Sequence, residues 1–286
     1  MKFFADTASI KEIEECFLKG VDDGITTNPG IMQATGDLSF GFEAACKAIL
    51  QAHPSVPVSL ETDLRGLNAD KIHSKPQEVK DILLKQAYEL ASWGKNVVVK
   101  IPICEGGLLA TQELARNNIK TNVTACMTPY QALAAADAGA AYVSLFANRM
   151  LDAHILDLAG HNLEDVLRQP DWKGILKSAQ TEFSNTAWII TLNHITYVAK
   201  KLESKYPKTE LIVGSIRSPE DIYRLDSAGP QVITIPAKIV RELTDIPELK
   251  KTQRKILGSA MHYGSSLYHP MTQKPCLYLN LPPFFA

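Results

Sequence analysis

The 286-residue sequence predicts an α/β protein, a single (β/α)8 barrel of the TIM-barrel class. Short β-rich runs alternate with longer helical patterns along the chain. Runs such as VVVKI and LIVGS are apolar at successive positions, which is typical of parallel strands that helices cover on both faces. The units also recur evenly, with 22 residues from Val97 to Ile119, 22 from Ile119 to Ala141 and 21 from Glu210 to Gln231. Such spacing indicates tandem strand–helix pairs.

Eight strands are expected, in the order that a barrel requires. They are Lys2–Ala5, Gly24–Thr27, Val56–Glu61, Val97–Ile101, Ile119–Thr124, Ala141–Phe146, Glu210–Ser215 and Gln231–Ile235. Helices are expected at Ser9–Lys19, Phe40–Ala52, Pro76–Ser92, Gly107–Asn117, Pro129–Ala138, Ala187–Tyr206 and Pro219–Ser227. An open doubly wound sheet is the competing arrangement, but no GxGxxG follows the first strand and the sequence has no P-loop.

The chain is expected to form one domain. Residues 1–245 would be the catalytic barrel, with an insertion after strand 6 at about 150–186, because the gap from Phe146 to Glu210 is far longer than its neighbours. That insertion is either a loop or extra helices. Residues 246–286 would be a C-terminal helical extension, a helix and tail of the same domain. The final LNLPPFFA either packs across a subunit boundary or is disordered.

Composition restricts the class of protein. Hydrophobic residues make up 45% and charged residues 21%, as in ordinary globular proteins, and the net charge of −1 argues against a nucleic-acid surface. The five cysteines are scattered and show no CxxC spacing, which indicates a reducing, cytoplasmic environment. The seven histidines show no HxH or HExxH spacing, so neither a metal nor a cofactor is expected. No export signal or membrane segment is expected.

Polar residues gather at the carboxyl ends of the predicted strands, where a barrel carries its active site. Alternate residues of a strand share a face, so the pattern places seven pairs inside the barrel. These are Phe4 with Asp6, Thr26 with Asn28, Ser59 with Glu61, Val98 with Lys100, Asn122 with Thr124, Ser144 with Phe146, and Val213 with Ser215. Ordinary roles stay open for single members: Asp6 could cap the first helix, and Asn28 before Pro29 could mark a turn.

A lysine among apolar strands has a specific chemical use. Burial favours the neutral form of a lysine amine, and a neutral amine attacks a carbonyl to form a Schiff base. The iminium that results withdraws electrons, so the adjacent C–C bond can break. Lys100 follows VVV, and the surrounding acidic, amide and hydroxyl groups match the acid/base and sugar-binding needs of such a reaction.

Five motifs resemble the transaldolase family of Schiff-base aldolases, in family order. They are KFFADTA, GITTNPG, VVVKIP, IKTNVTACMTPYQALAAADAGAAYVSLFANR and VGSIRSP. The resemblance covers about residues 1–150 and 211–243. It implies a barrel in which Lys100 is the nucleophile, Asp6 is the acid/base for the C4 hydroxyl, and Glu61 and Thr124 position the catalytic water. It also implies that Thr26, Asn28, Asn122 and Ser144 hold the dihydroxyacetone part, and that Arg149, Ser215 and Arg217 bind the substrate phosphate.

The chain departs from the family pattern at several positions. Leu145, Asn148, Gly30 and Cys104 replace the usual proline, glycine, hydroxyl residue and threonine, and Met150 and Leu151 precede Asp152 where the family has an acidic pair. Each residue to which the resemblance gives a catalytic role is still present.

The resemblance implies transfer of a dihydroxyacetone unit from a ketose phosphate to an aldose phosphate. Two alternatives stay open: a fructose-6-phosphate aldolase, which releases dihydroxyacetone, and a sugar-phosphate-binding barrel without turnover. The aldolase branch carries tyrosine in place of Phe146 and glutamine in place of Glu61, so this chain has the transferase pair. The expected partners are small sugar phosphates and further copies of the chain, with no nucleic acid and no membrane.

Overall fold

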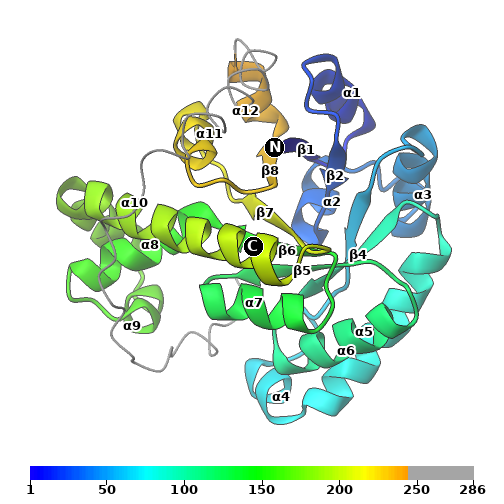
Figure 1. Ribbon diagram of the computed structural model, residues 1–286, viewed down its shortest axis with the longest axis horizontal. Coiled ribbons are helices and arrows are strands. Elements are labelled where there is room, and N and C mark those ends of the chain that lie inside the picture. The colour runs from blue at the N-terminus through cyan, green and yellow to red at the C-terminus, as the bar shows by residue number, and fades with distance from the viewer. Residues whose placement is uncertain (244–286) are drawn as a thin grey trace.

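The computed structural model describes residues 1–243, which form a closed barrel of eight parallel strands paired in chain order (Figure 1). The predicted barrel is therefore confirmed. The strands are β1 (Lys2–Asp6), β2 (Gly24–Thr26), β3 (Val58–Glu61), β4 (Val97–Pro102), β5 (Thr121–Cys126), β6 (Tyr142–Phe146), β7 (Glu210–Gly214) and β8 (Val232–Pro236). β1 pairs with β8 and closes the ring.

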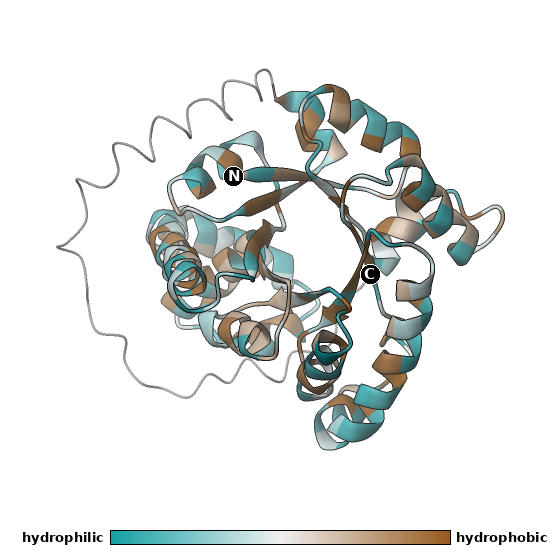
Figure 2. Cartoon of the chain, turned by 45° about the vertical axis from the view of Figure 1, so that its right-hand side comes forward, coloured by the Kyte–Doolittle hydropathy of each residue, from teal (hydrophilic) through white to brown (hydrophobic). Residues whose placement is uncertain are grey.

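Twelve helices lie in the described range, and most of them surround the strands (Figure 2). They are α1 (Ile10–Leu18), α2 (Pro29–Thr35), α3 (Phe42–Ala52), α4 (Ala69–Ser74), α5 (Pro76–Ser92), α6 (Glu105–Arg116), α7 (Pro129–Asp137), α8 (Ala147–Leu158), α9 (Leu163–Leu167), α10 (Trp172–Lys205), α11 (Pro219–Asp226) and α12 (Ala237–Glu242).

The expected strands and helices agree with the structure to within two residues at their ends, with one exception. The helix expected from Ala187 is the second half of α10, which begins at Trp172. No separate helices were expected at α2, α4, α8 or α9. The predicted tail at 246–286 lies outside the described residues.

The region around 150–186 is helical. It contains most of α8, all of α9 and the first half of α10, and the long helix α10 packs along α8. Asp171 caps α10 through the backbone N–H of Gly174, and no other glycine or proline interrupts the following 31 residues. Leu156, Leu176 and Ala187 are buried in this layer.

Apolar side chains fill the space between the strands and the outer helices, which is why the strands are buried on both faces. The four cysteines of the described range, at 16, 46, 104 and 126, are buried and free. None of the helices within residues 1–243 has the length and the apolar character needed to cross a membrane.

Candidate active site

The inside of the barrel is apolar at its N-terminal end and polar at its C-terminal end. Phe4, Ile212 and Val232 form a buried cluster inside the ring, and Tyr142 meets Phe4 edge to face with ring centroids 6.0 Å apart. Gly24 is required here, because a Cβ at this position would lie 2.6 Å from the Phe4 ring. This cluster, called the barrel floor below, closes one end and leaves the polar residues facing the other.

Lys100 lies above the floor on β4, with 6% of its side chain exposed. Its Nζ is 2.9 Å from Glu61 Oε2 on the adjacent strand β3, and it donates a hydrogen bond of 3.0 Å to the carbonyl oxygen of Thr27. The register pairs Glu61 with Lys100 directly. The contact has the geometry of an ion pair rather than an aligned hydrogen bond, since Glu61 Oε2 accepts none from the described residues.

Asp6 at the end of β1 is held by a chain of two hydroxyl groups. Thr26 on β2 donates a 2.7 Å hydrogen bond to Asp6 Oδ1, and Thr234 on β8 contacts the Thr26 hydroxyl. A hydroxyl carries one proton. Because Thr26 donates its proton to the Asp6 carboxylate, its oxygen accepts a hydrogen bond from the Thr234 hydroxyl. Three strands thus fix the direction of donation toward the carboxylate.

A second polar chain crosses β3, β5 and β6. Ser144 donates a 2.7 Å hydrogen bond to Asn122 Oδ1, and Asn122 Nδ2 donates to the Ser59 hydroxyl at 3.2 Å. All three residues are buried. Their side chains alternate with apolar residues that face the helices, as the strand period of two requires.

Thr124, on the other side of β4 from Glu61, has a buried hydroxyl without a hydrogen-bond partner in residues 1–243. The pairing of β5 with β6 shifts register just beyond it, and Ala125 adopts a left-handed conformation with φ of +60°. Of the two buried oxygens on the strands that flank Lys100, Thr124 Oγ1 can thus bind a polar ligand, whereas Glu61 Oε2 contacts the Lys100 ammonium.

Burial dominates the electrostatics of the two carboxyl groups. It raises the pKa of Asp6 above its ordinary value of 3.8, and the charge of Lys100 and the Thr26 hydrogen bond oppose this rise. Burial likewise raises the pKa of Glu61, which Lys100 lowers and the negative charge of Asp6 raises. The charge of Lys100 therefore opposes the rise of both pKa values without cancelling it.

The arginines expected to bind phosphate lie at the ends of β6 and β7. Arg149 is in the first turn of α8, is exposed, and makes no ion pair within the described range. Arg217 follows β7 and forms two hydrogen bonds with Asp152 of α8, of 2.9 and 2.5 Å. Asp152 therefore lies beside the candidate site, although no role was expected for it. It is 65 residues from Arg217 in the sequence, so no local pattern indicates that the two side chains pair.

The predicted alternation on β7 is wrong by one residue. Ile212 points into the barrel with Phe4, whereas Val213 packs in the outer core. Ser215 lies beyond the end of β7 with φ of +63°, so the alternation of a strand no longer orients it. The carbonyl oxygen of Ser215 accepts a 2.7 Å hydrogen bond from Asn148 Nδ2.

Asn28 and Phe146, which were also expected to contact the substrate, have other contacts in the structure. Asn28 caps α2, since its Oδ1 accepts from the Ile31 backbone N–H at 2.7 Å, so Asn28 and Pro29 begin a helix rather than a turn. Phe146 ends β6 half-buried and lines a cavity. Thr234 was missed, although the alternation applied to β8 places it beside Phe4, its partner in the β1–β8 register.

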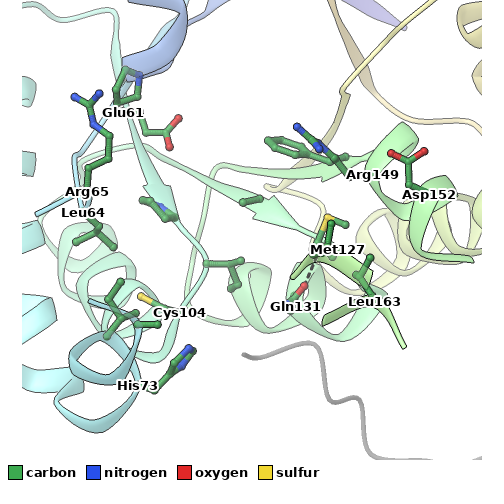
Figure 3. Close-up of a pocket in the computed structure, with 18 of the residues that line it drawn as sticks. Glu61, Leu64, Arg65, His73, Cys104, Met127, Gln131, Arg149, Asp152 and Leu163 are labelled. Carbon is green, nitrogen blue, oxygen red and sulfur yellow. Dashed lines mark hydrogen bonds between the residues drawn. The ribbon is translucent and has the colours of Figure 1, made fainter. Parts of the chain in front are cut away.

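A cavity of about 230 Å³ opens at the carboxyl ends of β3 to β6. In Figure 3, Glu61 and Arg149 lie on opposite sides of its upper part, and Cys104, His73 and Leu163 line its lower part. Glu61, which contacts Lys100, also lines this cavity, so the cavity adjoins the polar interior of the barrel.

Comparisons with known proteins agree with this geometry. Residues 3–273 match the sequence model of the family described as "Transaldolase/Fructose-6-phosphate aldolase". A "Probable transaldolase" of Maridesulfovibrio salexigens is 36% identical over 250 residues, which cover 86% of this chain and 92% of the relative. Its counterpart in Bdellovibrio bacteriovorus is 34% identical over 248 residues, 86% of this chain and 91% of the relative.

Among solved structures, the one titled "Native KDPGal structure" aligns with a TM-score of 0.45 and 10% identity over 91% of this chain and 95% of that chain. The family match spans the barrel from Phe3 in β1 through β8, the lysine strand included, and each of the two relatives covers 86% of the chain. The chain belongs to the transaldolase/fructose-6-phosphate aldolase family.

Proposed function

We propose that this protein is a transaldolase, which transfers dihydroxyacetone from a ketose phosphate to an aldose phosphate through a Schiff base on Lys100. The observation that carries the proposal is the buried Lys100–Glu61 pair, with Asp6 in the same polar interior. A lysine in this position has neutral and charged partners within reach but little water around it, which suits Schiff-base chemistry.

Formation of the Schiff base begins when the Lys100 ammonium passes a proton to the Glu61 carboxylate beside it, and the neutral amine then attacks the ketose carbonyl. The carbinolamine that forms must lose water, which requires a proton at its hydroxyl group. We assign this transfer to a water molecule held between Glu61 and Thr124, because the buried Thr124 hydroxyl has no hydrogen-bond partner among residues 1–243 and the Glu61 carboxylate lies beside Lys100 on the other neighbouring strand. A water there would satisfy the Thr124 hydroxyl, which is otherwise costly to bury.

Cleavage then occurs between C3 and C4 of the bound sugar. Asp6 takes the proton of the C4 hydroxyl, the C3–C4 bond breaks, and the electron pair moves toward the iminium nitrogen as the aldose phosphate leaves. In the reverse direction, the enamine attacks the acceptor aldehyde, and Asp6 returns the proton to the new hydroxyl. The raised pKa of Asp6 suits a group that must both accept and donate.

The sugar is held at both ends. Ser144 and Asn122, whose buried amide and hydroxyl groups line the interior, would bind the hydroxyls of dihydroxyacetone together with Thr26 and Asn28. Arg149, Arg217 and Ser215 at the ends of β6 and β7 would bind the phosphate, since guanidinium groups match phosphate oxygens.

Transfer rather than hydrolysis is supported by Phe146. A phenyl ring cannot donate a proton to the enamine, whereas a tyrosine hydroxyl at the same place could. The intermediate should then persist until an acceptor arrives. Such exchange between sugar phosphates is chemistry of the pentose phosphate pathway. The cytoplasmic location and the homo-oligomeric state stay predictions.

Borohydride reduction tests the nucleophile. Incubation with fructose 6-phosphate and borohydride is expected to leave a reduced adduct on Lys100, located by mass spectrometry of peptides. Lys100→Met should abolish both the adduct and turnover, while the exposed Lys95→Met should change neither. Trapping and turnover that survive in Lys100→Met would reject the mechanism.

An acceptor assay separates transferase from aldolase. With fructose 6-phosphate alone, slow release of dihydroxyacetone is expected; with erythrose 4-phosphate added, transfer should be fast. Phe146→Tyr should shift the balance toward release. Rapid cleavage by the unmodified protein without any acceptor would assign it to the aldolase branch instead. Tight binding of sugar phosphates with no exchange at all would favour the non-catalytic alternative.

A further inference from the structure

The loop between β7 and α11 is fastened to α8 by one buried amide group. Asn148, in the first turn of α8, is 4% exposed, and its Nδ2 donates two hydrogen bonds of 2.7 Å. One goes to the carbonyl oxygen of Ser215 and the other to Asp221 Oδ2 in α11. Both N–H groups of the amide are thereby used, since a side-chain amide has two.

Asp221 completes this connection from within α11. Its side chain is buried, and Oδ2 also accepts hydrogen bonds from the backbone N–H groups of Arg217 at 2.8 Å and Ser218 at 3.2 Å. Hydrogen bonds to a carboxylate are roughly twice as strong as those between neutral groups, so these contacts define the shape of the loop. Asn148, Asp221 and the backbone groups that they bind are called the loop clamp below.

The loop needs this support because its backbone is strained where it leaves the strand. Ser215 follows β7 directly and has φ of +63°, a left-handed conformation that costs free energy in any residue with a Cβ. The carbonyl of this same residue accepts the hydrogen bond from Asn148. Asn148 therefore stabilises the loop at the point where the chain turns toward Arg217.

The loop clamp also determines which groups can meet a phosphate here. Backbone N–H groups at the start of a helix commonly bind phosphate, but those of Arg217 and Ser218 already donate to Asp221. A phosphate at this end of the barrel therefore depends on side chains, for which the guanidinium groups of Arg149 and Arg217 are suited. In Figure 3, Arg149 lies at the upper edge of the cavity, on α8.

We propose that Asn148 and Asp221 are positioning residues that set the spacing of the Arg149 and Arg217 guanidinium groups for the substrate phosphate. The inference rests on the proposed function. Asn148 directly precedes Arg149 on α8, and Asp221 holds the backbone of Arg217, so the loop clamp joins the two segments that carry these arginines. Without it, phosphate binding would also have to order the loop, at a cost in conformational entropy.

Steady-state kinetics of the full chain test the positioning role. Asn148→Ala is expected to raise KM for fructose 6-phosphate about tenfold and to keep kcat within about twofold, because Lys100 and Asp6 are untouched. The inhibition constant of inorganic phosphate should rise by the same factor. Borohydride trapping of dihydroxyacetone, which carries no phosphate, should keep its rate.

Asn96→Ala is the matched control. Asn96 is half-buried, directly precedes β4, and donates from Nδ2 to the carbonyl oxygens of His53 and Val56 at 3.0 and 3.2 Å. It lies at the opposite end of the barrel, so its loss should lower stability without a rise in KM. Urea unfolding of both variants separates lost stability from lost phosphate binding.

Asp221→Ala provides a second test of the same clamp. It removes the acceptor of three hydrogen bonds, so KM should rise at least as much as in Asn148→Ala. The double variant should raise KM no further than Asp221→Ala alone, because residues that act through one network are not additive.

The outcomes separate the loop clamp from the proposed function. If the unmodified protein transfers dihydroxyacetone but Asn148→Ala raises KM no more than Asn96→Ala, the clamp is wrong and the transaldolase assignment stands. The clamp is also wrong if the two single rises multiply in the double variant, or if dihydroxyacetone trapping slows as much as KM rises. If the unmodified protein shows neither adduct nor transfer, the proposed function fails. Calorimetric titration with inorganic phosphate then decides the clamp, which requires weaker binding in Asn148→Ala than in Asn96→Ala.

Discussion

The barrel interior and the α8–α10 layer contribute to the same site in different ways. In the interior, most polar groups come from strands and are held by neighbours on adjacent strands, as half-buried Asp6 is by Thr26. Beside the α8–α10 layer, Arg149 and Arg217 are exposed, and Asp152 of α8 holds Arg217 across 65 residues of sequence. The proposed reacting groups are thus positioned by the strands, whereas the proposed phosphate-binding groups depend on how the helices pack.

The largest expected effect comes from Asp6→Asn in the barrel interior. Loss of the acid/base group should lower kcat about 10²- to 10⁴-fold. The same change should stabilise the fold near neutral pH, by about 1–2 kcal/mol, because it removes a buried charge. Steady-state kinetics and urea unfolding of the same sample measure both.

The pH dependence of stability tests whether the stabilisation by Asp6→Asn comes from removal of the charge. Asp6 has a raised pKa in the folded state, so the folded protein binds more protons and its stability falls as pH rises above 3.8. The advantage of Asp6→Asn should therefore vanish below this value. A gain that persists at pH 3 would show that the variant acts through packing rather than charge.

Asp152→Asn tests the contribution of the α8–α10 layer to the site. The proposed positioning of Arg217 predicts that KM for fructose 6-phosphate rises about tenfold while kcat changes little, because one bidentate ion pair is weakened. Arg217→Ala and Arg149→Ala should also raise KM. The exposed Asp157→Asn on the same helix is the control. A lower KM in Asp152→Asn would mean that Asp152 competes with phosphate instead of positioning Arg217.

Thr234→Val sharpens the view that strands set the reacting groups. In Thr234→Val, the Thr26 hydroxyl no longer accepts a hydrogen bond from residue 234, so it donates a weaker hydrogen bond to Asp6. The pKa of Asp6 should therefore rise further. We expect about a fivefold lower kcat and an acidic limb of kcat/KM shifted to higher pH, with both restored in Thr234→Ser. An unshifted pH profile would reduce Thr234 to a packing role.

The smallest expected effect concerns His154, which lies between α8 and α10. Its Nδ1 is 2.9 Å from the Thr191 hydroxyl, it stacks edge to face on His194, and burial lowers its pKa to about 4. The unfolded chain then binds more protons between pH 6.5 and 4, so stability falls with falling pH. From pH 8 to pH 6 the loss should be about 1 kcal/mol.

His154→Phe keeps a ring in place and removes this titration. Urea unfolding at the two pH values should show a smaller loss in the variant. The two regions thus respond to pH in opposite directions: Asp6 destabilises the interior as pH rises, and His154 destabilises the helical layer as pH falls. Equal pH dependence in both proteins would remove His154 from this account.

The sequence predicted the strands well because period and burial are local. VVVKIP reads as a buried strand by itself, and alternation then places Lys100 inside the barrel. Alternation failed on β7, where Ser215 lies beyond the last paired residue and the left-handed backbone breaks the pattern. It also could not distinguish Asn28 as a sugar ligand from Asn28 as a helix cap.

The helical side was less predictable for a physical reason. Short helices such as α4 and α9 have too few turns to show a period, and they form because other elements cover them. The Asp152–Arg217 pair depends on the packing of α8 against the end of β7, which no local pattern encodes. The cavity beside Glu61 is lined partly by these elements, so no local sequence pattern predicts it.

The barrel floor has a consequence for the order of events. Phe4, Ile212 and Val232 fill the N-terminal end, so in the proposed transfer the donor, the acceptor and water would all reach Lys100 through the opposite end of the barrel. The departing aldose must clear that passage before the acceptor enters. Initial rates should therefore follow a double-displacement pattern, with parallel double-reciprocal lines, and each aldose should compete with the other for the dihydroxyacetone-loaded enzyme.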